Sequence, residues 1–232
     1  MQVDPVIQSL HKYASTFHPV ILFTPGKDRF LQMDFTASNQ DLTDEIYSDI
    51  NKFSAYINAK LEENGCRYGI GGYNEHRTIY AASRHFDTGG EPRRLHLGTD
   101  IWAPAATPVY AFMGGRVHSF AYNNSAGDYG ATLILLHQLD GFAFYTLYGH
   151  IGLKDIENLT ASQYVVRGQQ IARLGTPEEN GHWPPHLHFQ VIINMELKQG
   201  DYPGVCKFSE SEKYLRNCPD PDLILQMNRY AQ

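Results

Sequence analysis

A helical spacing of apolar residues is clearest in residues 42–61. Every third or fourth position of this segment is apolar: Leu42, Ile46, Ile50, Phe53, Ile57 and Leu61. This spacing places the six side chains on one face of an α-helix, with polar residues on the other face. A glycine at position 65 is typical of a helix end. The pattern therefore predicts one amphipathic helix that ends near Gly65.

The segment before this helix has a different pattern. Residues 19–35, PVILFTPGKDRFLQMDF, contain two short apolar runs on either side of Pro25 and Gly26. Proline followed by glycine is typical of a turn, so the segment predicts two short strands around it. We therefore expect residues 1–65 to form an N-terminal α+β segment that is attached to the rest of the chain.

From about residue 68 onward, short runs rich in Val, Ile, Tyr and Phe alternate with Gly, Pro and Asp. Many short strands without long helices between them predict a mainly β fold, namely an antiparallel β-sandwich or barrel. Beyond residue 199, the tail 200–232 predicts a short helix and then an irregular segment that packs back on the core. The strand candidates are residues 107–120, 130–138, 141–150, 163–175 and 186–193.

Composition and charge exclude several classes of protein. The chain has 232 residues, enough for one domain with an appendage, and a net charge of −6 gives no reason to expect a nucleic-acid partner. No run approaches the roughly 18 apolar residues of a membrane span, so we expect no membrane partner. The start of the chain lacks the features of a signal peptide. A cytoplasmic location is expected, or a secreted or periplasmic one if a leader was trimmed.

Histidines are concentrated in residues 181–189, GHWPPHLHF, which hold three of the 11 in the chain. Residues i and i+2 of a strand share a face. His186 and His188 should therefore point the same way, and Leu187 should point into the core. Two imidazoles on one face indicate a metal site.

Two more motifs supply further ligand candidates. The stretch HLGTD places His96 and Asp100 four residues apart, and LYGH ends an apolar run at His150. Two histidines and one carboxylate form a set that suits zinc and leaves a fourth position open. If His96, Asp100 and one histidine of the HxH pair are ligands, the other histidine and His150 remain available. These two would transfer protons or stabilise an oxyanion. The spacing does not decide which of His186 and His188 is the ligand.

These motifs together resemble peptidase family M23, the lysostaphin and LytM-like zinc metallopeptidases. The resemblance rests on HLGTD, APAATPVYA, GGRV, LYGH, VVRGQQIARLG and PPHLHF in this order. It implies an M23-like domain over residues 66–199 with a β-sandwich of the duplicated hybrid-motif type. It also implies Zn²⁺ held by His96, Asp100 and His188, with His150 and His186 as the unligated catalytic histidines. No other cofactor is expected.

A longer similarity, from about Cys66 to Leu225, resembles a cytosolic branch of this family. In that branch the M23 domain lies beside a phosphotransferase domain and a class III aminotransferase. The function expected is zinc-dependent hydrolysis of a peptide or amide bond in a peptide or peptidoglycan-like substrate, and the oligomeric state stays open. Tyr148, Trp183 and Arg77 are candidates for lining the cleft, although each is as plausible in a structural role.

Two alternative functions are considered. The first is a phosphocarrier of the IIA type, which has a related fold and also brings two histidines together. Such a carrier does not need an aspartate in an HxxxD motif, so Asp100 argues against it. The second is a zinc-binding module without turnover, which substitution of His150 or His186 would distinguish from an enzyme.

Overall fold

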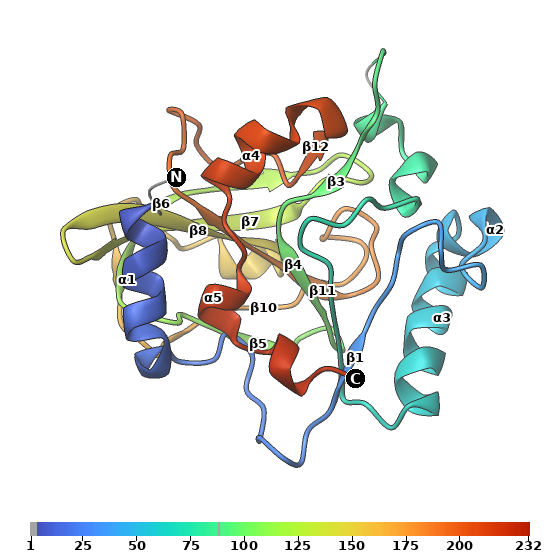
Figure 1. Ribbon diagram of the computed structural model, residues 1–232, viewed down its shortest axis with the longest axis horizontal. Helices are drawn as coiled ribbons and strands as arrows, with labels where there is room; N and C mark the ends of the chain where they lie inside the picture. Colours follow the sequence, from blue (N-terminus) through green and yellow to red (C-terminus); the bar gives the residue numbers. More distant parts are fainter. Residues whose placement is uncertain (1–3, 88) are drawn as a thin grey trace.

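A twisted eight-stranded sheet runs through the computed structural model, which describes residues 4–87 and 89–232 (Figure 1). Its strand order is β1-β2-β4-β11-β8-β7-β6-β9, and every pair is antiparallel except β1–β2. The bounds are β1 Phe30–Gln32, β2 Tyr68–Gly71, β4 Thr99–Trp102, β6 Gly115–Asn123, β7 Gly130–Leu139, β8 Phe142–Ile151, β9 Tyr164–Val165 and β11 His186–Ile192.

Two smaller sheets and several short helices surround this sheet. The small sheets pair β5 Pro108–Tyr110 with β10 Gln170–Arg173, and β3 Arg93–His96 with β12 Val205–Lys207. The α-helices are α1 Pro5–Tyr13, α2 Asp44–Tyr47, α3 Ile50–Glu63, α4 Ser211–Asn217 and α5 Asp222–Leu225. The 3₁₀-helices are Ala14–Thr16, Ile79–Ala82, Arg84–Phe86, Leu153–Asp155, Phe208–Glu210 and Asn228–Tyr230.

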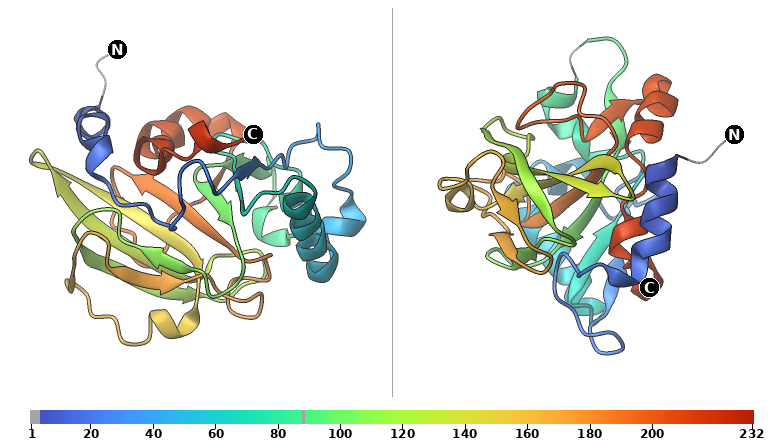
Figure 2. Two further views of the ribbon diagram at one scale, coloured as in Figure 1. Left: turned by 90° about the horizontal axis from the view of Figure 1, so that it is seen from below. Right: turned by 90° about the vertical axis from the view of Figure 1, so that its left-hand side faces the viewer.

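The largest hydrophobic core lies between the eight-stranded sheet and the β5–β10 pair. Alternate residues of β11, Leu187, Phe189 and Val191, point into it and pack with Val109 of β5 and Ala172 of β10. The helices α1 and α5 lie side by side and close the same core (Figure 2). This two-layer, mainly β arrangement confirms the predicted fold class. The β1–β2 pair makes the sheet mixed.

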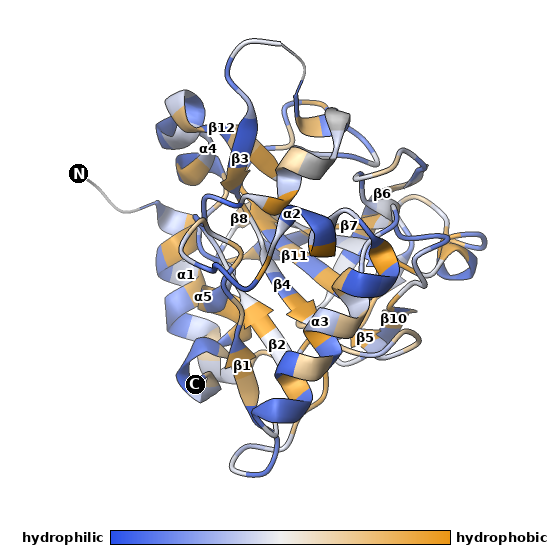
Figure 3. Cartoon of the chain, turned by 90° about the vertical axis from the view of Figure 1, so that its right-hand side faces the viewer, coloured by the Kyte–Doolittle hydropathy of each residue, from blue (hydrophilic) through white to orange (hydrophobic). Residues whose placement is uncertain are grey.

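A second core lies where α3 covers the end of the sheet formed by β2 and β4 (Figure 3). Phe53, Ile57 and Leu61 of α3 pack there with Trp102 of β4. The helix predicted over residues 42–65 is broken after α2, because the Asp49 side chain accepts hydrogen bonds from the first backbone N–H groups of α3. An aspartate in this position is a strong start signal for a new helix.

Other sequence predictions are confirmed in part. The strand candidates from residue 107 onward match β5 to β11, and the predicted tail helix matches α4. Of the two strands expected in residues 19–35, only β1 forms, and the sequence pattern gave no indication of α1. Within the described residues, no helix combines the length and the apolar character that a membrane crossing requires.

Candidate metal centre

Strand pairing brings together residues that lie far apart in the sequence. In the β11–β4 pair, His188 lies directly opposite Asp100, and in the β11–β8 pair it lies opposite Gly149, next to His150. Because side chains alternate along β11, His186 and His188 share the face that carries Asp100. Leu187 is buried in the core on the other face, as predicted.

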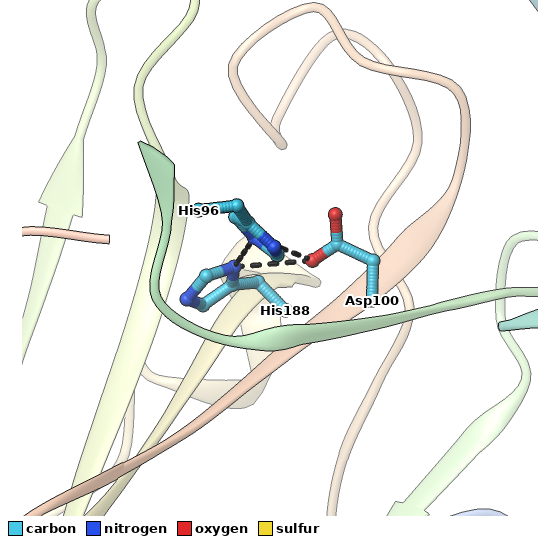
Figure 4. Close-up of side chains that lie close together, drawn as sticks. All are labelled: His96, Asp100 and His188. Carbon is cyan, nitrogen blue, oxygen red and sulfur yellow. Dashed lines mark hydrogen bonds and ion pairs between the residues drawn. The ribbon is translucent and has the colours of Figure 1, made fainter. Parts of the chain in front are cut away.

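Three donor atoms converge at this point (Figure 4). His96 Nε2 lies 3.0 Å from His188 Nδ1. Asp100 Oδ1 lies 3.1 Å from His188 Nδ1 and 3.3 Å from His96 Nε2. All three side chains are almost completely buried. The structure therefore places the three predicted ligands in one group.

The glycine of HLGTD allows this close approach. His96 ends β3, Asp100 lies in β4, and Gly98 lies in the connection between them. A Cβ atom on Gly98 would lie 2.5 Å from His188 Cε1, which is closer than such atoms approach in proteins. A larger residue at position 98 would therefore displace the His188 ring.

Outer hydrogen bonds fix the protonation of both imidazoles. His96 Nδ1 lies 3.1 Å from the Gly72 carbonyl oxygen, which can only accept, so Nδ1 carries the proton. His188 Nε2 lies 2.9 Å from Gln190 Oε1. The Gln190 amide nitrogen donates to Pro203 O and Cys218 Sγ, so its oxygen must face His188. His188 Nε2 therefore carries the proton and donates it to Gln190.

The consequence is that lone pairs of His96 Nε2 and His188 Nδ1 and an oxygen of Asp100 face one another. With both imidazoles neutral this arrangement is repulsive, and either a proton on one of the nitrogens or a cation between the atoms relieves the repulsion. The spacings of 3.0, 3.1 and 3.3 Å are close to the edge of about 3.3 Å in a zinc tetrahedron with ligand bonds near 2.0–2.1 Å. Two imidazoles and one carboxylate also form a donor set that suits zinc. The residues present therefore fit a zinc ion.

Electrostatics keep the donors ready for a metal. Burial and the Arg77 guanidinium lower the pKa of His96 to about 3. Burial alone would raise the pKa of Asp100, but His96 and Arg77 outweigh it and hold that pKa well below its usual range. At neutral pH His96 is therefore uncharged and Asp100 is ionised, which are the forms that bind metals.

The two remaining predicted residues, His150 and His186, lie next to this group. Their ring centroids are 4.2 Å apart, and His186 Nε2 lies 3.9 Å from Asp100 Oδ2. His150 Nδ1 donates to Asn180 O at 2.8 Å, and His186 Nδ1 donates to Pro184 O at 2.7 Å. Burial lowers the pKa of both rings. Each imidazole is thus neutral at pH 7 and keeps its Nε2 lone pair for another partner.

A cleft opens onto these residues. Its walls carry aromatic rings from four parts of the chain: Tyr80 and Phe86 before β3, Tyr129 before β7, Trp183 before β11, and Tyr202 after β11. Arg77 and Trp183 line the cleft, as the sequence suggested, but Tyr148 does not. The Tyr148 ring is buried in the opposite core and packs against Phe189.

Several site residues were missed by sequence reasoning. Gln190 continues the alternation of His186 and His188 along β11, so its position on the same face was a usable signal. Glu75 and Asn180 had no such signal. Each contributes to the site only because a loop folds beside β3 or β8, as the backbone hydrogen bonds from His96 N to Glu75 O and from Gly175 N to His150 O show.

Comparison with known proteins identifies a matching family. Residues 94–199 match the family described as Peptidase family M23. A curated relative, an L-Ala–D-Glu endopeptidase of Bacillus subtilis strain 168, is 30% identical over 65% of this chain and 44% of its own length. The peptidoglycan DD-endopeptidase ShyC of Vibrio cholerae is 31% identical over 48% of this chain and 25% of its own length.

A solved structure shows a more limited likeness. The crystal structure of a zinc-containing peptidase from Vibrio cholerae has 33% sequence identity, covers 42% of this chain and 27% of the other, and gives a TM-score of 0.34. The chain spans less than half the length of the two curated relatives.

Proposed function

We propose, from the match of residues 94–199 to peptidase family M23, that the chain is a zinc-dependent peptidase. The proposed substrate is a peptide or peptidoglycan-like compound with a peptide or amide bond that the enzyme hydrolyses. One observation carries the proposal: ligand atoms of His96, Asp100 and His188 all lie within 4.8 Å of one another, and two further histidines line the cleft beside them.

In this proposal His96 Nε2, Asp100 Oδ1 and His188 Nδ1 hold the zinc ion. Zinc bound there would supply Lewis acidity, which polarises a carbonyl group and makes water more acidic. The outer bonds to Gly72 O and Gln190 Oε1 keep the two imidazoles oriented. Such outer partners are a general feature of metal-binding histidines.

His150 and His186 form the proposed proton-transfer pair. Each ring donates Nδ1–H to a backbone carbonyl, so each has only Nε2 available for chemistry. A neutral imidazole can accept a proton from the attacking water at Nε2 and deliver it to the leaving amine. The ring of Trp102 stacks on His186 at 5.5 Å and holds its plane. We assign the two transfers to the pair together.

The cleft supports a substrate with a peptide-like shape. Aromatic rings line it together with the proton-transfer pair, so apolar parts of a peptide would pack on these rings beside the two histidines. The names of two curated relatives specify peptidoglycan or an L-Ala–D-Glu bond. Peptidoglycan peptides are therefore the first substrates to test, followed by free dipeptides of D- and L-amino acids.

The test combines metal analysis with product analysis. The purified chain should bind one zinc per chain and release peptides or amino acids from peptidoglycan fragments or from a dipeptide panel, detected by mass spectrometry. His186→Ala serves as the control, because it keeps all three proposed ligands. Absence of stoichiometric zinc binding would refute the metal assignment. Zinc binding without cleavage of any compound in either set would favour the module without turnover.

A further inference from the structure

Arg77 is an unusual residue to find beside a cation site. Its side chain is only 1% exposed, and it lies next to Asp100. Burying a charged side chain is unfavourable unless its partners compensate. Arg77 Nη2 has no hydrogen-bond partner in the described part of the chain.

The contacts of Arg77 hold the guanidinium in one position. Its Nε donates to Glu75 Oε2 at 2.6 Å, and its Nη1 donates to Asp100 Oδ2 and, at 3.2 Å, to Tyr80 Oη. The rings of Phe35 and Trp102 lie 5.2 and 5.7 Å from the guanidinium carbon. Charge, hydrogen bonds and aromatic faces therefore restrain the group from several sides.

The two oxygens of the Asp100 carboxylate have different partners because of the position of Arg77. Oδ2 accepts from Arg77, while Oδ1 faces His96 and His188. Because Oδ2 is held by the Arg77 guanidinium and only Oδ1 faces the two imidazoles, a cation between these atoms would meet one oxygen of Asp100. We propose that Arg77, held by Glu75, is a positioning residue that makes Asp100 a one-oxygen ligand. This inference rests on the proposed function.

Arg77 and Glu75 both lie before the segment that matches the family, which begins at residue 94. They reach the site because residues 74–77 run beside β3, with hydrogen bonds from Arg77 N to Arg94 O and from Asn74 N to His96 O. The Arg77–Glu75 pair that contacts Asp100 therefore comes from outside the segment that matches the family. Glu75 also accepts a hydrogen bond from the Phe35 backbone N–H at 3.3 Å, and this bond helps to hold the Glu75 carboxylate in place.

The experiment must separate the effect of the contacts that Arg77 makes from the effect of its positive charge. Removing the positive charge of Arg77 alone would favour a cation and would hide the loss of positioning. Two variants keep the net charge: Arg77→Lys, and the double variant Arg77→Gln/Glu75→Gln. Lysine carries a compact point charge without a planar fork of donors, so it cannot reproduce the two-sided contact of the guanidinium. Leu10→Ala is the control, since Leu10 is buried in α1 far from the cleft and its truncation destabilises the fold generally.

The full chain would be freed of metal and titrated with Zn²⁺ against a chromophoric chelator, and separately with Co²⁺. The charge-conserving double variant should bind zinc about 10–100-fold more weakly than the wild type. Its Co²⁺ absorption should be weaker, because Asp100 can then bind through both oxygens and raise the coordination number. Arg77→Lys should share the weaker Co²⁺ spectrum, and Leu10→Ala should keep the wild-type spectrum.

Wild-type zinc affinity and Co²⁺ absorption in both Arg77 variants would overturn the positioning role and leave the proposed function intact. Full rescue by Arg77→Lys would also overturn it, because charge alone would then suffice. Failure of the wild type to bind either metal would refute the proposed function and this inference together. If the double variant does not fold, Arg77→Lys alone decides by its Co²⁺ spectrum.

Discussion

Gln190 offers a sharp test of how the site is prepared for a metal. Its oxygen accepts from His188 Nε2 at 2.9 Å, and its nitrogen is held by Pro203 O and Cys218 Sγ. Gln190→Met removes the acceptor but keeps the volume. The next oxygen, Tyr129 Oη, lies 3.5 Å from His188 Nε2, too far to replace the lost bond. In this variant the proton of His188 should move to Nδ1 and point at Asp100.

The expected magnitude follows from the single bond that is lost. Loss of an outer hydrogen-bond partner of a metal-binding histidine typically weakens metal affinity about 10–100-fold, which corresponds to about 1.4–2.7 kcal/mol in the free energy of zinc binding. Gln190→Glu is the matched variant, since its carboxylate still accepts from His188. It should keep at least the wild-type affinity, although the unpaired Pro203 carbonyl makes the fold less stable by about 1–3 kcal/mol.

Two measurements decide the Gln190 prediction. Chelator competition gives the zinc Kd, and long-range ¹H–¹⁵N NMR of the metal-free protein reports which nitrogen of His188 carries the proton. Circular dichroism checks that each variant is folded. The reasoning is wrong if folded Gln190→Met binds zinc as tightly as the wild type. It is equally wrong if Gln190→Glu loses as much affinity as Gln190→Met.

Three further predictions follow from the site and the core. His150→Ala or His186→Ala should lower turnover by about 10²–10⁴-fold and still bind one zinc per chain. His188→Ala should lose the metal. Activity assays measure the turnover of these variants, and metal analysis measures their zinc content. Gly98→Ala places a Cβ 2.5 Å from His188 Cε1, so zinc affinity in the chelator assay should fall at least about tenfold. Burial lowers the pKa of His137 from 6.5 to about 4, so its stabilising contribution is complete above pH 6.5 and decreases as the pH falls toward 4. Urea unfolding between pH 8 and 5 should show the wild type losing about 2 kcal/mol more than His137→Gln.

Local periodicity explains which parts of the site were predictable. His186 and His188 share a face because strand side chains alternate, and this rule needs no knowledge of the rest of the fold. The meeting of His188 with Asp100 depends on the β11–β4 pairing. Spacing alone did not establish that pairing, and the family resemblance supplied it. The break between α2 and α3 was readable in principle, since Asp49 is a strong helix start.

The residues that support the ligands were not predictable in the same way. Arg77 and Glu75 lie in a segment without regular hydrophobic periodicity. Their role arises only when residues 74–77 align with β3. The sequence around position 77 does not indicate whether the arginine is buried or exposed. Long-range pairing, which a single sequence does not encode locally, determines this part of the site.

The cleft also bears on how the chain is divided. The predicted boundaries after residues 65 and 199 stay predictions, but the two flanking segments contribute directly to the site. β1 extends the main sheet through β2, Phe53 of α3 lines the cleft, and Tyr202 and Gly204 border it from the tail. The family segment supplies the proposed ligands and the histidine pair, whereas much of the surface around them comes from outside it. In the proposed peptidase, selectivity for a substrate should therefore depend on residues outside the segment that matches the family.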